Sequence, residues 1–256
     1  MLAVLLISQA AALGLLLPVA FALADDGPSA AAVGWAALGG CAGVIALAAF
    51  YRGLAIGTMS VVAPISATGA AVPVLVGLAE GERPGVLQVV GMAAALAGVI
   101  LASRESEPAE DLGAEHRAAG RAAVGLALVA AAGFGTFFVG VARASATAEV
   151  PWVIVISRSC SLVLVLIAAL VARPDLPRDA ASFGALAVIG VLDLGANGLF
   201  AIATTEGLLS VVAVLGSLYP AVTVVLARLV LAERVSRLQE VGVAMTLAGV
   251  VAISAG

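Results

Sequence analysis

Long apolar runs with almost no charge dominate this chain of 256 residues and limit what it can fold into. Hydrophobic residues make up 63% of the sequence and charged residues 11%, with a mean hydropathy of +1.20. Soluble domains are only ~45–50% apolar and ~25% charged. The run 86–103 carries no charge, whereas charges crowd the segment 104–117. This segregation excludes a soluble domain and a disordered chain, and it predicts a membrane-embedded protein.

A helix needs about 20 apolar residues to cross a ~30 Å hydrocarbon core, and we predict nine such spans. The first run is longer than the ~7–15 residues of a signal-peptide core and no basic residue precedes it, so we expect it to be retained. The fold class is therefore an all-α polytopic membrane protein. The predicted spans are 2–24, 31–51, 60–79, 86–103, 121–142, 150–172, 183–205, 209–232 and 238–255.

Charge and cysteine usage exclude several classes of partner and cofactor. The net charge is −4 and all twelve basic residues are Arg, which leaves no basic patch to neutralise nucleic-acid phosphates, so we expect no nucleic-acid partner. Cys41 and Cys160 lie in apolar runs, where we expect them to act as small hydrophobic residues. The single His116 lies in the acidic segment. We expect no metal, no cofactor and no enzymatic activity; an integral membrane enzyme, which needs clustered His, Asp or Glu, is a remote alternative.

An internal repeat is the strongest signal in the sequence. Ser60-Val61-Val62-Ala63 recurs 150 residues later as Ser210-Val211-Val212-Ala213, and Glu82-Arg83 recurs 151 residues later as Glu233-Arg234. Further matches pair Phe50 with Phe200, Gly57 with Gly207, Leu87-Gln88 with Leu238-Gln239, Gly91 with Gly242, and Leu96-Ala97-Gly98-Val99 with Leu247-Ala248-Gly249-Val250.

The repeat predicts two copies of opposite orientation. We assign residues 1–103 to a first copy with four spans, 104–120 to an acidic hydrophilic linker, and 121–256 to a second copy with five spans. Five predicted spans separate Glu82 from Glu233, so the two Glu-Arg turns face opposite sides of the membrane. Inverted repeats of this kind are typical of secondary transporters, whose substrate sites lie near the bilayer midplane.

The repeated residues resemble a known family. Ser210 to Pro220, followed by Leu226-Ala227-Arg228, Ala232-Glu233-Arg234 and Leu238-Gln239, is similar to the second repeat of EamA-type members of the drug/metabolite transporter superfamily. The first copy resembles the same motif. The resemblance implies a transporter in the cell membrane that moves a small metabolite or drug-like solute by alternating access. Glu82, Arg83, Glu233 and Arg234 are then signature residues, to which we assign a structural role.

The first copy has one span fewer than the family's five. Leu6-Ile7-Ser8-Gln9 aligns with Val155-Ile156-Ser157-Arg158, so the element without a counterpart is the family's first helix. Either the true start lies upstream of Met1, or the chain is a natural nine-span variant. In the second case, an accessory or transport-defective protein that needs a partner is the main alternative function. The membrane orientation stays open, because the resemblance implies a cytoplasmic C-terminus while most Arg residues fall on the opposite side.

Two ionisable residues stand inside predicted spans, where charge is costly and marks a functional site by default. They are Arg158 and Asp193, and Asn197 follows Asp193 by one helical turn on the same face. One interpretation is a structural ion pair between neighbouring helices. The other is that Asp193 titrates or binds a charged group of the substrate, with protons as the candidate coupling ion. In the repeat alignment Gly43 is the counterpart of Asp193, so this acid is not duplicated in the first copy.

Prolines interrupt the equivalent third and eighth spans, where breaks are tolerated if the helix lines a cavity. Hydroxyl side chains near these breaks are candidate contacts for a polar or zwitterionic solute, or bond their own backbone instead. The prolines are Pro64, Pro73 and Pro220, and the hydroxyl residues are Ser66, Thr68, Ser217, Tyr219 and Thr223. The expected partners are the lipid bilayer and a small solute; a homodimer is left open.

Overall fold

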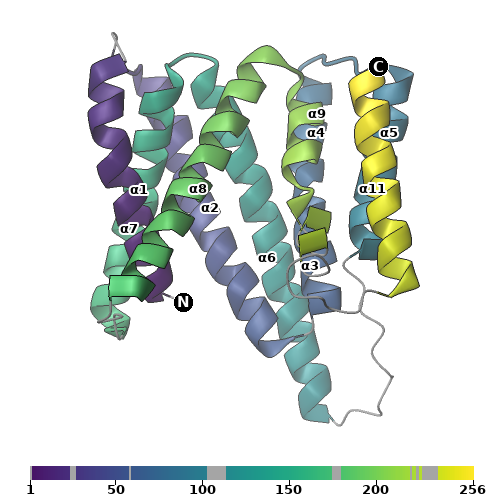
Figure 1. Ribbon diagram of the computed structural model, residues 1–256, viewed down its shortest axis with the longest axis horizontal. Helices are drawn as coiled ribbons and strands as arrows, with labels where there is room; N and C mark the ends of the chain where they lie inside the picture. The colour runs from purple at the N-terminus through teal and green to yellow at the C-terminus, as the bar shows by residue number, and fades with distance from the viewer. Residues whose placement is uncertain are drawn as a thin grey trace. The chain divides into compact units, whose positions relative to one another are not determined.

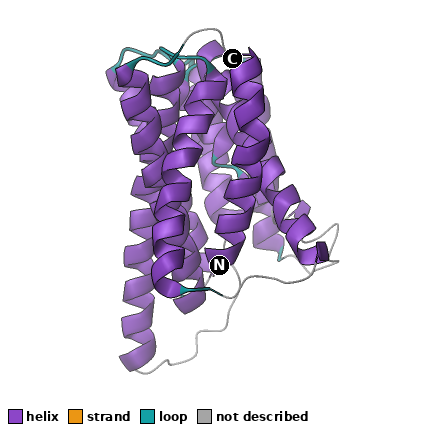
Figure 2. Cartoon of the chain, turned by 90° about the vertical axis from the view of Figure 1, so that its left-hand side faces the viewer, coloured by secondary structure: helices purple, strands orange, loops and turns teal. Residues whose placement is uncertain are grey.

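The computed structural model describes residues 2–23, 27–57, 59–102, 114–174, 180–219, 221–222, 225–226 and 236–256. These ranges are helical apart from short turns and contain no strand (Figures 1 and 2). The helices are α1 (Leu2–Leu23), α2 (Ala30–Ile56), α3 (Met59–Ala67), the 3-10 turn η1 (Thr68–Ala70), α4 (Ala71–Ala79), α5 (Val86–Ala102), α6 (Ala114–Ser145), α7 (Val150–Ala172), α8 (Ala180–Glu206), α9 (Leu209–Gly216) and α11 (Arg237–Ala255).

Seven of the helical stretches are long and apolar enough to cross a membrane, and α5 is a shorter apolar helix. Large apolar side chains such as Leu170, Val171 and Leu192 are exposed along them. A soluble protein rarely shows so much exposed apolar surface, whereas a bilayer solvates it. The all-α polytopic fold predicted from the sequence is confirmed.

The largest differences between the helix bounds and the predicted spans are the following. Helix α2 continues to Ile56, and α6 begins at Ala114, inside the segment expected as linker. The third span is divided into α3, η1 and α4. Pro73 has no N–H to donate to the carbonyl of Gly69 four residues earlier, which accounts for the 3-10 turn at this point. Of the eighth span, α9 and a few later residues are described.

The chain forms two compact units, each of which combines segments from both halves of the sequence. The first unit comprises Met1–Val44 and Thr136–Gly207, and the second comprises Ile45–Gly135 and Leu208–Gly256. Helices α2 and α6 each contribute one part to each unit.

In the first unit, helices of the two sequence copies pack through equivalent small residues. A Cβ atom at Gly40 would overlap the backbone of Ser157, and a Cβ at Gly190 would overlap the backbone of Ser8. Gly40 and Gly190 are 150 residues apart, and Ser8 is the counterpart of Ser157. Small residues at both contacts allow the helix backbones to approach closely. The sequence repeat is thus also a repeat of contacts.

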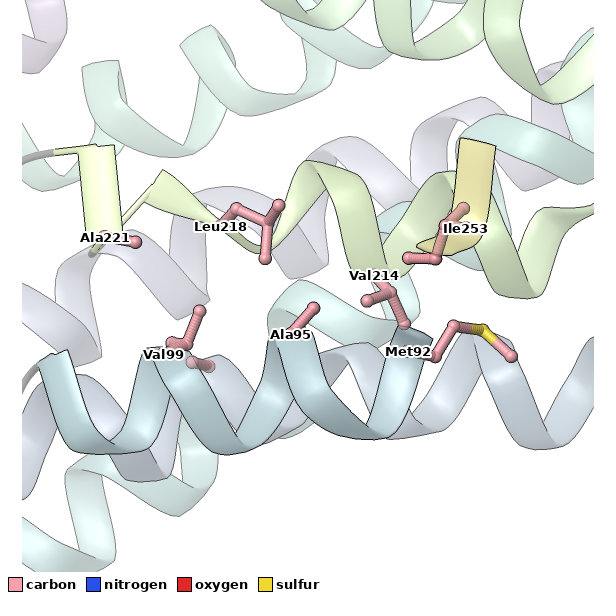
Figure 3. Packing of buried hydrophobic residues seen from close by; sticks show 8 residues of the cluster. Met92, Ala95, Val99, Val214, Leu218, Ala221 and Ile253 are labelled. Atoms are coloured by element: carbon pink, nitrogen blue, oxygen red, sulfur yellow. The ribbon is translucent and has the colours of Figure 1, made fainter. Parts of the chain in front are cut away.

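In the second unit, α5 and α11 lie side by side and run antiparallel (Figure 1). Gly91 approaches Gly249, and Gly98 approaches Gly242. Because α5 and α11 are equivalent helices of the two copies, their opposite directions agree with inverted repeats. Beside this contact, Met92, Ala95, Val99, Val214, Leu218, Ala221 and Ile253 belong to one buried apolar cluster (Figure 3).

Candidate functional site

Arg158 and Asp193 form an ion pair in the interior of two membrane-spanning helices of the first unit. Arg158 lies on α7 and Asp193 on α8, each more than one helical turn from either helix end. The Nη2 atom of Arg158 pairs with the Oδ2 atom of Asp193. The Nδ2 atom of Asn197 donates to Oδ1 of Asp193 at 3.1 Å and to the Asp193 carbonyl at 2.7 Å. The three polar residues singled out in these spans therefore lie together.

Gln9 of α1 is a fourth member of this cluster that we did not select from the sequence. The Nη1 atom of Arg158 donates to Oε1 of Gln9 at 3.4 Å, and Gln9 is buried. Its signal was present in the repeat, because Gln9 is the counterpart of Arg158 in the first copy. An uncharged amide inside an apolar run is a weaker signal than a charge, but the alignment singles it out.

The two charges of the pair differ in exposure. The Arg158 side chain is 12% exposed and the Asp193 side chain 52% exposed. Helix α8 is also the least buried of the long apolar helices. Of its most apolar 18-residue stretch 11% is buried, against 39% for the corresponding stretch of α2. A half-exposed carboxylate at this depth is costly against lipid, so its exposed side requires water, a solute or protein. This arrangement can attract a cationic group to Asp193 while Arg158 keeps its hydrogen bond to Gln9.

The predicted hydroxyl contacts belong to the second unit, and three of them bond their own helix. Ser66 Oγ donates to the Val62 carbonyl at 2.8 Å, Thr68 Oγ1 to Ile65 at 2.6 Å, and Ser217 Oγ to Val214 at 2.8 Å. Ser66 and Ser217 are buried, while Thr68 is exposed. Such bonds satisfy the hydroxyl hydrogen, so a ligand would have to replace them or use the oxygen as an acceptor.

Tyr219 is the aromatic member of this group. Its ring packs edge-on against Phe50, with ring centroids 6.2 Å apart, and Phe50 also contacts Phe134. Pro64 lies within α3 and Pro73 in the first turn of α4, next to the break at η1. Pro220 and Thr223 lie outside the described residues.

The signature residue Glu82 contacts the other copy of the repeat. Its Oε1 atom accepts the N–H of Leu209 at 2.6 Å and its Oε2 atom accepts the N–H of Ser210 at 3.1 Å. These amides open α9, whose own N-cap residue Leu208 makes no side-chain cap. The carboxylate thus satisfies donors that a helix start leaves free. Arg83 is exposed, and Glu233 and Arg234 lie outside the described residues.

Cys41 on α2 and Cys160 on α7 are both free thiols. Their helices meet where Ser161 Oγ donates to the Gly40 carbonyl at 2.7 Å. Among the described residues there is no group of three or more His, Cys, Asp or Glu side chains that could hold a metal ion.

Comparison with known proteins decides the family. The model of the EamA-like transporter family matches residues 121–255, more than half of the chain. The chain belongs to the EamA-like transporter family. It is therefore a multi-pass membrane transporter of small solutes, in a family of transporters rather than enzymes.

Structural comparison supports the same fold for this EamA-like transporter. A crystal structure whose title reads only "Crystal structure of protein" matches with a TM-score of 0.78 and 14% sequence identity. The match covers 98% of this chain and 86% of the other. At this identity the likeness concerns the fold alone. No curated protein matches the sequence.

Proposed function

We propose that this protein is a secondary transporter of the cell membrane that moves a small polar or zwitterionic metabolite by alternating access. The observation that carries the proposal is the half-exposed Asp193 carboxylate, paired with Arg158 in the interior of the spans. A pair of opposite charges suits a solute that carries both, because an amino group can compete for Asp193 and a carboxylate for Arg158. Gln9 and Asn197 hold the pair in position through hydrogen bonds.

Protons are the candidate coupling ion, with Asp193 as the group that carries them. Protonation of this carboxylate would release its attraction for Arg158 and for a cationic solute together. A solute bound to one protonation state only would then be linked to the proton gradient.

Flux into proteoliposomes tests this function with a panel of amino acids, nucleosides and cationic drugs under an imposed pH gradient. We expect Asp193→Asn to lower flux of the transported solute at least tenfold and to abolish its pH dependence. Glu206→Gln, at the end of the same helix, is the matched control and should retain both. Unchanged flux and pH dependence in Asp193→Asn would refute the proposed role of Asp193.

The same assay addresses the accessory alternative. If no solute in the panel is transported and a second membrane protein co-purifies with the chain, the accessory function replaces the transporter proposal. The low burial of α8 is the observation that favours this second candidate, since a partner helix could cover that face.

A further inference from the structure

The turn after α4 is built to present one carboxylate. Gly81 adopts φ +95°, a left-handed conformation that favours glycine and ends the helix. The N–H of Glu82 then donates back to the Gly77 carbonyl at 2.9 Å. A Cβ atom at Gly77 would overlap the Glu82 carboxylate, so this glycine leaves the space that the side chain occupies. The Glu82 side chain therefore folds back over α4 into the space beside Gly77, and its carboxylate lies between α4 and the start of α9.

The carboxylate reaches across 127 and 128 positions of sequence to Leu209 and Ser210. It is the contact by which the α4–α5 turn of the first copy is attached to the Ser-Val-Val-Ala start of the second copy. A carboxylate with one amide on each oxygen is a strong, charge-assisted arrangement at a helix N-terminus.

The start of α9 also carries a cost in this arrangement. Ser210 is completely buried, and within the described ranges its Oγ atom has no hydrogen-bond partner. A buried hydroxyl without a partner loses its hydration and gains nothing in return. A movement at the start of α9 that let water reach this hydroxyl would relieve the cost. The two Glu82 bonds and the buried Ser210 hydroxyl thus act in opposite directions.

We propose that Glu82 is a gating residue, which holds the start of α9 closed against the α4–α5 turn and releases it when the transporter opens at that face. This inference rests on the proposed function, since alternating access requires one face to open while the other is closed. It differs from a purely structural cap, which would stay closed in every folded molecule.

Thiol labelling of residue 210 measures the opening directly. The background is Cys41→Ser with Cys160→Ser, and Ser210→Cys provides the only thiol, because the chain has two cysteines. N-Ethylmaleimide is added to the full-length protein in proteoliposomes. We expect Glu82→Gln to accelerate labelling at least tenfold, because the neutral side chain has one acceptor oxygen where the carboxylate uses two. Glu206→Gln, an exposed carboxylate three residues before Leu209, is the control and should leave the rate unchanged.

A second reporter separates gating from general loosening. Thr246→Cys places a thiol at a buried position of α11 in the same unit. If Glu82→Gln accelerates labelling at 210 but not at 246, the gate is supported. Equal acceleration at both positions, or no acceleration at 210, would overturn it. The labelling needs no solute, so a failed flux experiment leaves this result interpretable.

Discussion

At the scale of single residues, Arg158 is the side chain whose burial most needs an explanation. It is nearly buried in a membrane-spanning helix, and its two nitrogen contacts come from Asp193 on α8 and Gln9 on α1. A guanidinium group has five N–H donors in a planar fork, which suits simultaneous contact with two neighbours. Arg158 therefore joins three helices of the first unit, in addition to its proposed contact with a solute.

Removal of one partner should expose this dependence. We expect Asp193→Ala to lower the free energy of unfolding by ~2 kcal/mol, less than the ~3–5 kcal/mol for a fully buried pair, because Asp193 is half exposed. The double variant Arg158→Met/Asp193→Leu should recover most of the loss, since it leaves no unpaired charge. Unfolding by SDS titration in mixed micelles measures both, with Glu206→Ala at the exposed end of the same helix as the control. A double variant that is less stable than Asp193→Ala would contradict the account.

The residues of the Arg158–Asp193 cluster and the Glu82 contact differ in how well the sequence predicts them. Arg158 and Asp193 stand out because a charge inside an apolar run is rare, and Asn197 follows by helical spacing. Gln9 requires the repeat alignment. The contact of Glu82 with α9 is harder still, because its partners are backbone amides and every residue has one. Only the folded chain shows which helix start lies beside that turn.

At the scale of elements, small residues set how closely the helices pack. Two glycines on α5 and two on α11 face each other along the antiparallel contact, and all four recur at the repeat interval. Membrane helices gain little from apolar burial, because lipid is apolar too. Close backbone approach is therefore the main source of attraction between α5 and α11. The sequence predicts the positions of these glycines, but not that the two helices are each other's partners.

A methyl group at this contact should weaken the pair. A Cβ at Gly98 would lie 2.5 Å from the backbone nitrogen of Thr246 and 2.6 Å from the Gly242 carbonyl oxygen. We expect Gly98→Ala to lower the free energy of unfolding by about 1–3 kcal/mol, because backbone atoms cannot yield as a side chain can. Gly125→Ala on α6 is the matched control.

The control glycine is also helical but has no heavy atom within 4 Å of the added Cβ. Its substitution should be neutral or stabilise the protein by up to about 1 kcal/mol through helix propensity. SDS-induced unfolding followed by circular dichroism compares the two variants. Equal stability of Gly98→Ala and Gly125→Ala would show that the α5–α11 contact is looser than described.

A cross-link tests the contact between α2 and α7. Cys41 and Cys160 are the chain neighbours of Gly40 and Ser161, which are joined by a hydrogen bond, so mild oxidation with copper phenanthroline should link the two thiols through a disulfide. Mass spectrometry of the unreduced protein detects the loss of two hydrogens. Cys160→Ser removes the partner and should abolish the product. Two thiols that remain free in the oxidised wild-type protein would contradict the packing of these helices.

At the scale of the whole molecule, the repeat explains why each compact unit draws on both halves of the chain. Equivalent contacts recur within the first unit, at Gly40 with Ser157 and at Gly190 with Ser8. Within the second unit, the equivalent helices α5 and α11 pair with each other. The packing contacts of each unit thus join residues from both copies. We therefore expect neither half of the chain to fold stably without the other.

The antiparallel pair also makes a definite prediction for membrane topology. A Cβ at Gly85 would lie 3.8 Å from the Gly256 carbonyl oxygen, so the α4–α5 turn lies beside the C-terminal end of α11. Helix α11 has 19 residues and, at 1.5 Å per residue, is about 28 Å long, close to the thickness of the hydrocarbon core. Its first residue, Arg237, must then emerge on the side opposite to Arg83.

Single thiols at these two positions test the arrangement. In the background Cys41→Ser/Cys160→Ser, a membrane-impermeant maleimide added to sealed right-side-out vesicles should label one of Arg83→Cys and Arg237→Cys. Lysis of the vesicles should then allow the other to react. The position labelled before lysis also decides the orientation. Arg83 lies on the same side as the C-terminus and most other Arg residues on the opposite side, so an exterior Arg83 places the Arg-rich side in the cytoplasm. Labelling of both from outside would mean that α11 does not cross the bilayer, and the inverted topology would have to be abandoned.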